Sequence, residues 1–209
     1  MLDLLRRMRG IRSRTDLLNH LARSRSCRRY LEIGVRDRRH NFDKIQIEIK
    51  HGVDPNPRRP VTHPVTSDEF FRQRPASAPG YDLVFIDGLH LAAQVEKDVE
   101  NSLAALAPGG AIVLHDCNPL TADAQTDDYD GKKHWNGTVW KAWAKLRATR
   151  TDLQMCVVDI DEGCGVIERG TQAVYPLPST TFEDLTYDLL ASSRRELLNL
   201  ISVDAFLKA

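Results

Sequence analysis

The chain has 209 residues, of which 42% are hydrophobic and 28% are charged, and its formal net charge at pH 7 is zero. This length predicts one domain with its own core, and the composition excludes disordered and fibrous proteins. The sequence contains no run of eighteen apolar residues, so we expect no membrane span.

The N-terminal segment, residues 1–27, is expected to be helical and basic. Residues 1–30 carry nine arginines and two aspartates, a net charge of +7, and Leu17 and Leu21 lie at helical spacing after a Thr15–Asp16 start. The segment lacks the apolar region and cleavage site of a secretory signal, which predicts a cytoplasmic protein. A solvated amphipathic helix is the simplest interpretation, so we expect no nucleic-acid partner and expect the helix to be dispensable for chemistry.

Apolar runs next predict strands of a parallel sheet. They cover residues 30–35, 51–54, 81–87 and 111–116, and the third run is apolar enough to be covered on both faces. Apolar residues at helical spacing between 92 and 106 make the last two strands a βαβ unit. Residues 41–50 fit a helical face and an alternating strand equally well, and both interpretations stay open.

The second half of the chain predicts a loop, two helices and a hairpin. Residues 120–134 are irregular and acidic, which favours a solvated lid, and Trp140 and Trp143 then mark the core face of a helix. Residues 153–160 and 166–168 flank a turn and predict an antiparallel hairpin at the sheet edge. A last helix over 182–201 would dock on the body or on a second subunit, as in a homodimer.

Four strand ends carry polar residues in succession. They are Glu32-Ile-Gly34, Gly52-Val-Asp54, Asp87-Gly-Leu-His90 and His115-Asp116-Cys-Asn118. A single acid at a strand end is often only a turn former. Because ligands of open parallel sheets bind at the carboxyl ends of the strands, four such ends indicate a binding site, and an acid after the second strand suits ribose hydroxyls.

Several motifs are missing. The sequence contains no G-x-G-x-x-G, no G-x-x-x-x-G-K-[ST] and no G-x-S-x-G, which argues against dinucleotide binding, P-loop phosphoryl transfer and the hydrolase elbow. Among the ligands that these absences leave possible is a nucleoside cofactor without a pyrophosphate.

Five segments in this order resemble class I S-adenosylmethionine-dependent methyltransferases. They are Tyr30-Leu-Glu-Ile-Gly-Val35, Val53-Asp54, Thr66-Ser-Asp-Glu-Phe-Phe71, Phe85-Ile-Asp-Gly-Leu-His90 and Pro108-Gly-Gly-Ala-Ile-Val-Leu-His-Asp116. More narrowly, the chain is similar to the branch that includes macrolide-sugar O-methyltransferases and cephalosporin-hydroxylase-like proteins. With the predicted elements, the resemblance implies a doubly wound, Rossmann-like α/β fold. Its seven-stranded sheet would be mainly parallel, with the antiparallel hairpin at its C-terminal end. The methyltransferase domain would span residues 28–170, followed by a docking helix within 171–209.

The resemblance implies S-adenosylmethionine as cofactor and assigns residues to it. Glu32 and Gly34 would lie at its methionine end, Asp54 would bind the ribose, and Ser67 and Asp68 would lie near the adenine. After Gly34 the family often shows a second glycine, where this chain has an arginine-rich run from Arg36.

The same resemblance implies a divalent cation. Asp87, which also belongs to the cofactor-binding set, and Asp116 would hold it, with His115 in place of the usual acid. Magnesium prefers such oxygen ligands, and the histidine would admit manganese.

His90 matches the histidine that the related sugar methyltransferases are thought to use as general base. A hydroxyl must lose its proton as the methyl group arrives, and an imidazole can accept that proton near neutral pH. His134 is a second candidate for proton transfer.

These residues predict O-methylation of a hydroxyl on a sugar or polyol-like metabolite, either a small molecule or a glycan. Two alternatives remain. One is a cephalosporin-hydroxylase-like oxygenase, for which the sequence offers no evident 2-His-1-carboxylate iron site. The other is a non-catalytic, cofactor-binding scaffold that docks through its basic N-terminus.

Overall fold

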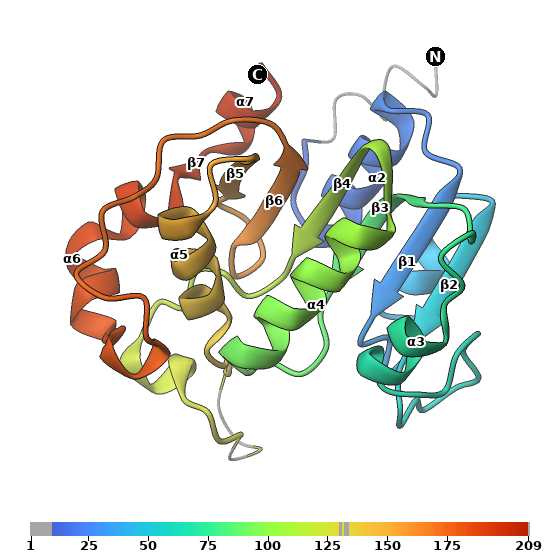
Figure 1. Cartoon of the computed structure of the whole chain (residues 1–209), viewed down its shortest axis with the longest axis horizontal. Helices are drawn as coiled ribbons and strands as arrows, with labels where there is room; N and C mark the ends of the chain where they lie inside the picture. Colours follow the sequence, from blue (N-terminus) through green and yellow to red (C-terminus); the bar gives the residue numbers. More distant parts are fainter. Residues whose placement is uncertain (1–9, 130, 132–133, 209) are drawn as a thin grey trace.

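The computed structural model describes residues 10–129, 131 and 134–208. Within this part, seven strands form one sheet in the order β2-β1-β3-β4-β6-β5-β7 (Figure 1). The strands are β1 (Arg29–Ile33), β2 (Ile49–Val53), β3 (Tyr81–Ile86), β4 (Leu106–Leu114), β5 (Leu153–Val158), β6 (Cys164–Arg169) and β7 (Leu200–Ile201). The helices are α2 (Arg14–Ser24), α3 (Ser67–Gln73), α4 (Ala92–Ala105), α5 (Val139–Thr149), α6 (Tyr187–Leu198) and α7 (Val203–Phe206). Short 3-10 helices cover Phe42–Lys44, Ala122–Gln125 and Phe182–Asp184.

The sheet confirms the predicted fold class. β1, β2, β3 and β4 are parallel, and β6 is antiparallel to both β4 and β5. The chain moves outward from β1 to β2 and then returns to the other side of β1 with β3. The strand order therefore reverses at β1, and such a reversal is where open α/β sheets bind ligands.

Both interpretations of residues 41–50 apply in part. A 3-10 helix occupies Phe42–Lys44, and β2 begins at Ile49. The apolar side chains between them, Ile45 and Ile47, are buried under one face of the sheet.

The core has one layer on each face of the sheet. Along β3, Leu83 and Phe85 pack toward α2, whereas Val84 and Ile86 pack toward α4 and α5. All four are at most 2% exposed, which explains why the sequence of this strand is apolar without alternation. Truncating a buried phenylalanine such as Phe85 to alanine costs about 3–5 kcal/mol of stability.

The two tryptophans of α5 lie in the core, as predicted. Trp140 and Trp143 are fully buried. Trp143 Nε1 donates a hydrogen bond to the carbonyl of Leu198 at 3.1 Å, and this contact docks α6 on α5. The last helix is therefore shorter than predicted and packs on its own chain, because it starts at Tyr187 and residues 200–201 form β7 along the edge of β5.

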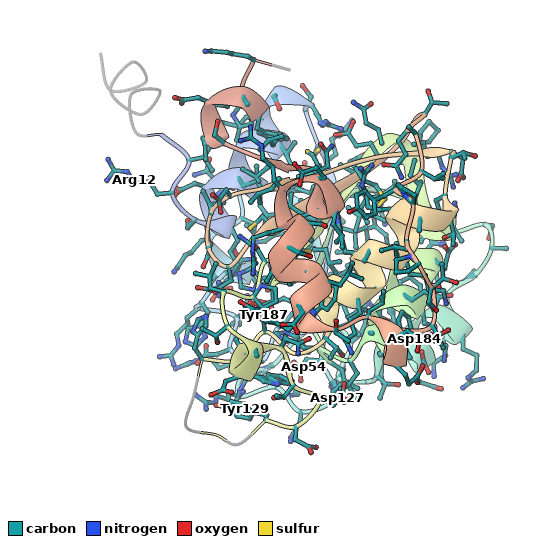
Figure 2. All side chains as sticks on the ribbon, turned by 90° about the vertical axis from the view of Figure 1, so that its left-hand side faces the viewer. Arg12, Asp54, Asp127, Tyr129, Asp184 and Tyr187 are labelled. Carbon is teal, nitrogen blue, oxygen red and sulfur yellow. The ribbon has the colours of Figure 1, made fainter. Side chains whose placement is uncertain are left out.

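Helix α6 also holds the segment that follows β4. Arg194 Nη1 donates to Asn118 Oδ1 at 2.6 Å and to the carbonyl of Pro119 at 2.7 Å. Tyr187, at the start of α6 (Figure 2), donates from its hydroxyl to the carbonyl of Leu120. The exit from β4 is thereby fixed by residues from the end of the chain.

The predicted basic segment is described from residue 10 onward, and residues 1–9 lie outside the described part. Helix α2 starts at Arg14, one residue before the predicted start, because the side chain of Ser13 caps it by accepting from Asp16 N. Among the described helices, none combines the length and the apolar character that crossing a bilayer requires.

Candidate functional site

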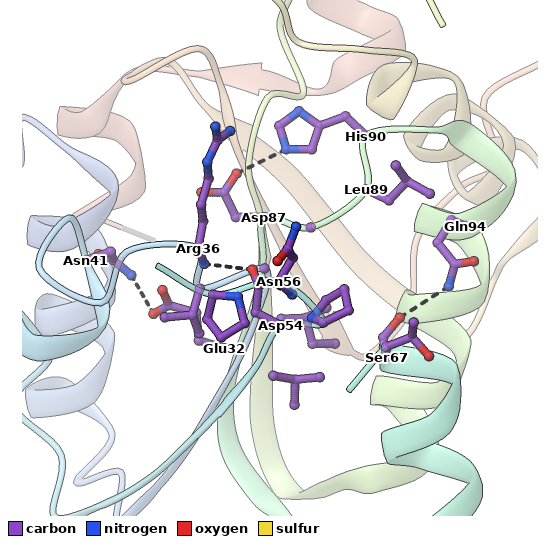
Figure 3. Close-up of a pocket in the computed structure, with 18 of the residues that line it drawn as sticks. Glu32, Arg36, Asn41, Asp54, Asn56, Ser67, Asp87, Leu89, His90 and Gln94 are labelled. Carbon is purple, nitrogen blue, oxygen red and sulfur yellow. Dashed lines mark hydrogen bonds and ion pairs between the residues drawn. The ribbon is translucent and has the colours of Figure 1, made fainter. Parts of the chain in front are cut away.

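The carboxyl ends of the central strands open into one cavity of about 1080 Å³ (Figure 3). Backbone hydrogen bonds continue past the strands and align their ends, from Gly34 N to Val53 O, from Asp87 N to Ile33 O and from His115 N to Ile86 O. Most of the predicted site residues line this cavity, namely Glu32, Gly34, Asp54, Ser67, Asp68, Asp87 and His90. Asp116 and His115 lie directly behind Asp87 and His90, within 3.3 Å of them.

Gly34 lets β1 and β3 meet at the cavity. Its φ is +88°, a left-handed conformation, and a Cβ atom there would lie 2.1 Å from the carbonyl oxygen of Asp87. Only glycine fits this position. The close approach keeps Asp87 at the floor of the cavity.

Asp54 is fixed by the backbone at the end of β2. Its Oδ2 accepts from Arg36 N and its Oδ1 from Asn56 N, both at 2.7 Å. Each carboxylate oxygen has a further lone pair, so the group can still accept from two vicinal hydroxyls. This geometry agrees with the predicted ribose contact.

Glu32 is a buried acid at the cavity, with 2% of its surface exposed. Its Oε2 accepts from the Tyr30 hydroxyl at 2.5 Å and from Asn41 Nδ2 at 2.8 Å. Burial raises the pKa of Glu32 from 4.5 to about 7, although these two hydrogen bonds oppose the change. The group is therefore poised to ionise near neutral pH when a cation enters the cavity.

Ser67 and Asp68 lie in the first turn of α3, next to α4. Gln94 Nε2 donates to Ser67 Oγ at 3.3 Å, to Asp68 Oδ1 at 3.1 Å and to Asp98 Oδ1 at 3.0 Å. Burial raises the pKa of Asp98 to about 6. Neither Gln94 nor Asp98 was expected in the site, because the helix over residues 92–106 is predicted from its apolar positions alone.

Two acids and two histidines meet at the ends of β3 and β4. His90 Nε2 lies 3.3 Å from Asp87 Oδ1, and His90 Nδ1 lies 3.3 Å from Asp116 Oδ2. His115 Nδ1 lies 3.3 Å and 3.0 Å from the same two oxygens. Ligand atoms of Asp87, His90 and Asp116 all lie within 4.8 Å of one another. The polar residues that the sequence predicts at the ends of these two strands thus lie next to one another in the fold.

The backbone around this cluster is constrained. Asp116 has a φ of +61°, a left-handed conformation that aspartate tolerates better than most residues. Asn136 Nδ2 donates to Asp116 Oδ1 at 2.6 Å. Gly137 follows with a φ of +62°, and a Cβ atom there would lie 2.2 Å from the carbonyl oxygen of His90. The segment 136–138 therefore holds both Asp116 and His90.

Arg14 is a site residue that the sequence analysis did not find. Its Nη1 lies 3.2 Å from His115 Nε2 and 3.2 Å from Asp161 Oδ2, and its Nε lies 3.9 Å from Asp87 Oδ2. The sequence pattern places Arg14 in the basic N-terminal helix that was expected to be solvated, and it places Asp161 in the turn between residues 160 and 166. No local signal could have paired them, because 147 residues separate them in the chain.

The contact with Arg14 orients His115. His115 Nε2 faces Arg14 and lies 3.7 Å from Asp161 Oδ1, and Nδ1 faces the carboxylates of Asp87 and Asp116. The role of His115 as a metal ligand stays a prediction. Burial lowers the pKa of His115, but Asp87, Asp116 and Asp161 outweigh it and raise the pKa well above its ordinary value.

The histidines and acids of the cluster also shift one another's pKa values. Burial acts to raise the pKa of Asp87, yet His115 and His90 hold it well below its ordinary value. For His90 burial acts to lower the pKa, and the hydrogen bond and charge of Asp87, with the charge of Asp116, raise it. The cluster therefore favours ionised carboxylates beside imidazoles that readily hold a proton.

Trp135 covers His90. The two rings are stacked, with centroids 5.2 Å apart and planes 9° apart. Trp135 Nε1 donates to the carbonyl of Thr126 at 2.7 Å, and Tyr129 packs on the indole at 5.3 Å. His134 lies nearby but pairs with Glu162 at 2.8 Å and is 66% exposed, so His90 is the better placed of the two candidate bases.

Comparison with known proteins supports the class of protein. Residues 17–117 match a protein family described as a methyltransferase domain, whereas comparison with curated proteins finds no match. Among solved structures, the fold is similar to that of a proposed O-methyltransferase from Klebsiella pneumoniae. The TM-score is 0.56 at 12% identity, over 78% of this chain and 83% of that one.

Two further structures are similar. For a proposed caffeoyl-CoA O-methyltransferase from Staphylococcus aureus, the TM-score is 0.53 at 16% identity, over 75% of this chain and 82% of that one. For cofactor-bound Rv0187 from MTB, it is 0.50 at 14% identity, over 73% and 78%. At such identities the likeness concerns the fold. The matched segment supports the predicted class, a class I S-adenosylmethionine-dependent methyltransferase, and the solved structures confirm the fold expected for it. The narrower resemblance to macrolide-sugar O-methyltransferases and cephalosporin-hydroxylase-like proteins stays a prediction.

Proposed function

We propose that the protein transfers a methyl group from S-adenosylmethionine to a hydroxyl of a sugar or polyol-like metabolite, free or within a glycan. One observation carries the proposal. A single cavity joins the groups suited to a nucleoside cofactor, Glu32, Asp54 and Ser67, to the acid and histidine pair Asp87 and His90. Groups suited to a cofactor and a general base thus share one cavity, where in-line methyl transfer can bring the reacting atoms together.

His90 is the proposed general base. It lines the cavity, its side chain is 15% exposed, and Asp87 and Asp116 lie 3.3 Å from its two ring nitrogens. As the acceptor oxygen bonds to the methyl carbon, the carbon–sulfur bond breaks, S-adenosylhomocysteine leaves, and His90 takes the hydroxyl proton. The two carboxylates stabilise the imidazolium that forms, and Trp135 keeps its ring plane fixed.

A divalent cation fits the same cluster. Asp87 and Asp116 would supply two carboxylate oxygens, and the ligand atoms of these two acids and of His90 lie within 4.8 Å of one another. We propose magnesium, with manganese as the alternative that a nitrogen ligand such as His115 would favour. When bound, the cation would lower the pKa of the acceptor hydroxyl.

Calorimetric titration with S-adenosylmethionine and S-adenosylhomocysteine is the first test, and we expect micromolar binding to one site. Labelled S-adenosylmethionine is then incubated with fractionated metabolites and glycans. We expect the label in a product that resists alkaline hydrolysis, as a methyl ether does and a methyl ester does not.

Absence of cofactor binding would overturn the proposal. Binding without transfer to any fraction would favour the scaffold alternative, and oxygen consumption that requires iron would favour the oxygenase. A cytoplasmic location and a homodimer stay predictions.

A further inference from the structure

Two arginines at the mouth of the cavity have no acidic partner in the described part of the chain. Arg36 and Arg58 both line the cavity, and both are exposed. Their guanidinium groups make no hydrogen bond or ion pair with any residue that the structure describes. The two residues are joined through the backbone, because Arg58 N donates to the carbonyl of Arg36 at 2.6 Å.

Neighbouring arginines on the same two loops differ in this respect. Arg38 pairs with Asp43 at 2.6 Å, and Asp37 pairs with Arg39 at 2.6 Å and with Arg59 at 3.7 Å. None of these three arginines lines the cavity. Among the residues described, these loops thus neutralise the arginines that point elsewhere and leave without an acidic partner the two that face the cavity.

Arg36 is held in place by its backbone. Its φ is +40°, in the left-handed region that usually requires glycine, and its N–H donates to Asp54 Oδ2 at 2.7 Å. Figure 3 shows the side chain running from beside Asp54 toward Asp87 and His90. The guanidinium group therefore extends toward the end of the cavity where the proposed chemistry takes place.

We infer that Arg36 and Arg58 form a subsite for an anionic group, a carboxylate or a phosphate, on the methyl acceptor. The inference rests on the proposed function and names its substrate class, a hydroxyl compound with a negative charge. Guanidinium groups bind both anions through paired hydrogen bonds. S-adenosylmethionine carries a sulfonium cation, so an anionic acceptor would offset the positive charge gathered at this end.

The carboxylate of the cofactor is the other possible source of the anion. The acceptor is favoured because the predicted methionine end lies at Glu32 and Gly34, whereas the Arg36 side chain extends past Asp54 toward His90. A test must therefore separate the two sources.

The first experiment measures probe binding to the protein saturated with S-adenosylhomocysteine. Glycerol 3-phosphate is titrated beside glycerol, its uncharged counterpart, and we expect only the phosphate to bind measurably. The double variant Arg36→Gln/Arg58→Gln should bind the phosphate about 10- to 100-fold more weakly. The control Arg38→Gln/Arg59→Gln, which changes two paired arginines of the same loops, should bind it as the wild type does.

The second experiment compares S-adenosylhomocysteine with 5′-methylthioadenosine, which lacks the aminoacyl carboxylate. An unchanged ratio of the two affinities in the double variant supports the acceptor subsite, and a collapsed ratio assigns the arginines to the cofactor and overturns it. Equal phosphate binding by wild type and double variant, or none by either, also overturns it. If S-adenosylhomocysteine does not bind, the proposed function fails by itself, and phosphate titration of the free protein still tests the anion subsite.

Discussion

Arg14 Nη1 and His115 Nε2 lie 3.2 Å apart, although 101 residues separate them in the chain. Arg14 comes from the start of α2, before the segment that matches the methyltransferase family. Its guanidinium group also reaches Asp161, in the turn between β5 and β6. A residue of the basic N-terminal segment thus orients a histidine behind the candidate site, and this argues against the expectation that the whole segment is dispensable.

The first prediction concerns Arg14. Replacing it with methionine keeps the length of the side chain but removes the guanidinium group that contacts His115 Nε2 and Asp161, so the imidazole ring loses a contact that holds its orientation. We expect the turnover number to fall about 10- to 100-fold, as for loss of a group that orients a site residue, with little change in S-adenosylhomocysteine affinity. Arg12→Met is the matched control, because the Arg12 side chain projects away from the body (Figure 2). Equal turnover of the two variants would show that Arg14 has no positioning role.

The second prediction concerns the acids at the ends of β3 and β4. If Asp87 and Asp116 share a cation, EDTA should stop turnover, and added magnesium or manganese should restore it. Asp116→Asn should lose most activity and respond weakly to added ion. Asparagine tolerates the left-handed backbone at this position and keeps an oxygen that can accept from Asn136 Nδ2, so the circular dichroism spectrum should show a folded variant. Full activity in EDTA would show that the reaction needs no cation and that the two carboxylates only contact His90 and His115.

His90→Ala separates the base from the metal site. Loss of a general base should lower the turnover number by about 10² to 10⁴, with affinity for the cation nearly unchanged. A comparable loss of metal affinity, measured by titration with manganese, would instead make His90 a ligand. That outcome would fit its position within 4.8 Å of both acids.

The third prediction concerns Asp54. Asp54→Ala should weaken S-adenosylhomocysteine binding about 10- to 100-fold, because hydrogen bonds to a charged acceptor contribute about 1.5–3 kcal/mol. It should also lower the melting temperature, because the N–H groups of Arg36 and Asn56 lose their acceptor. Asp43→Ala, which removes the exposed partner of Arg38, is the control and should change neither quantity. Unchanged affinity in Asp54→Ala would disprove the ribose assignment.

The fourth prediction follows from the raised pKa of Glu32. With a pKa of about 7, the carboxyl group is about half protonated at pH 7. A cationic cofactor nearby favours the carboxylate form, so binding should release about half a proton at that pH, and affinity should increase as the pH rises through 7. Calorimetry in buffers of different ionisation enthalpy measures the release, and Glu32→Gln should abolish it. Proton uptake, or no dependence on buffer, would place the cofactor's charge away from Glu32.

Local patterns were enough to predict six of the seven strands and the strand ends, whereas β7 was expected to belong to the last helix. The apolar run of β3, the helical spacing in α4 and the turn before β6 each depend on neighbouring residues, and Asp87 and His90 lie within four residues of each other. The groups that orient the cluster could not be predicted in this way. Arg14, Asp161 and Asn136 reach it from distant segments, and only the fold determines which of many surface arginines meets a buried histidine.

The hydrogen bonds between α6 and the segment that follows β4 affect the order in which the chain can fold. Arg194 follows Asn118 by 76 residues, and β7, which covers the edge of β5, comes later still. Because chains are synthesised from the N-terminus, Asp116 leaves the ribosome long before the residues that fix its loop, and β5 stays an open edge until then. A nascent chain, or one cleaved before α6, would thus pair its first four strands while the segment after β4 still lacks its contacts with Arg194.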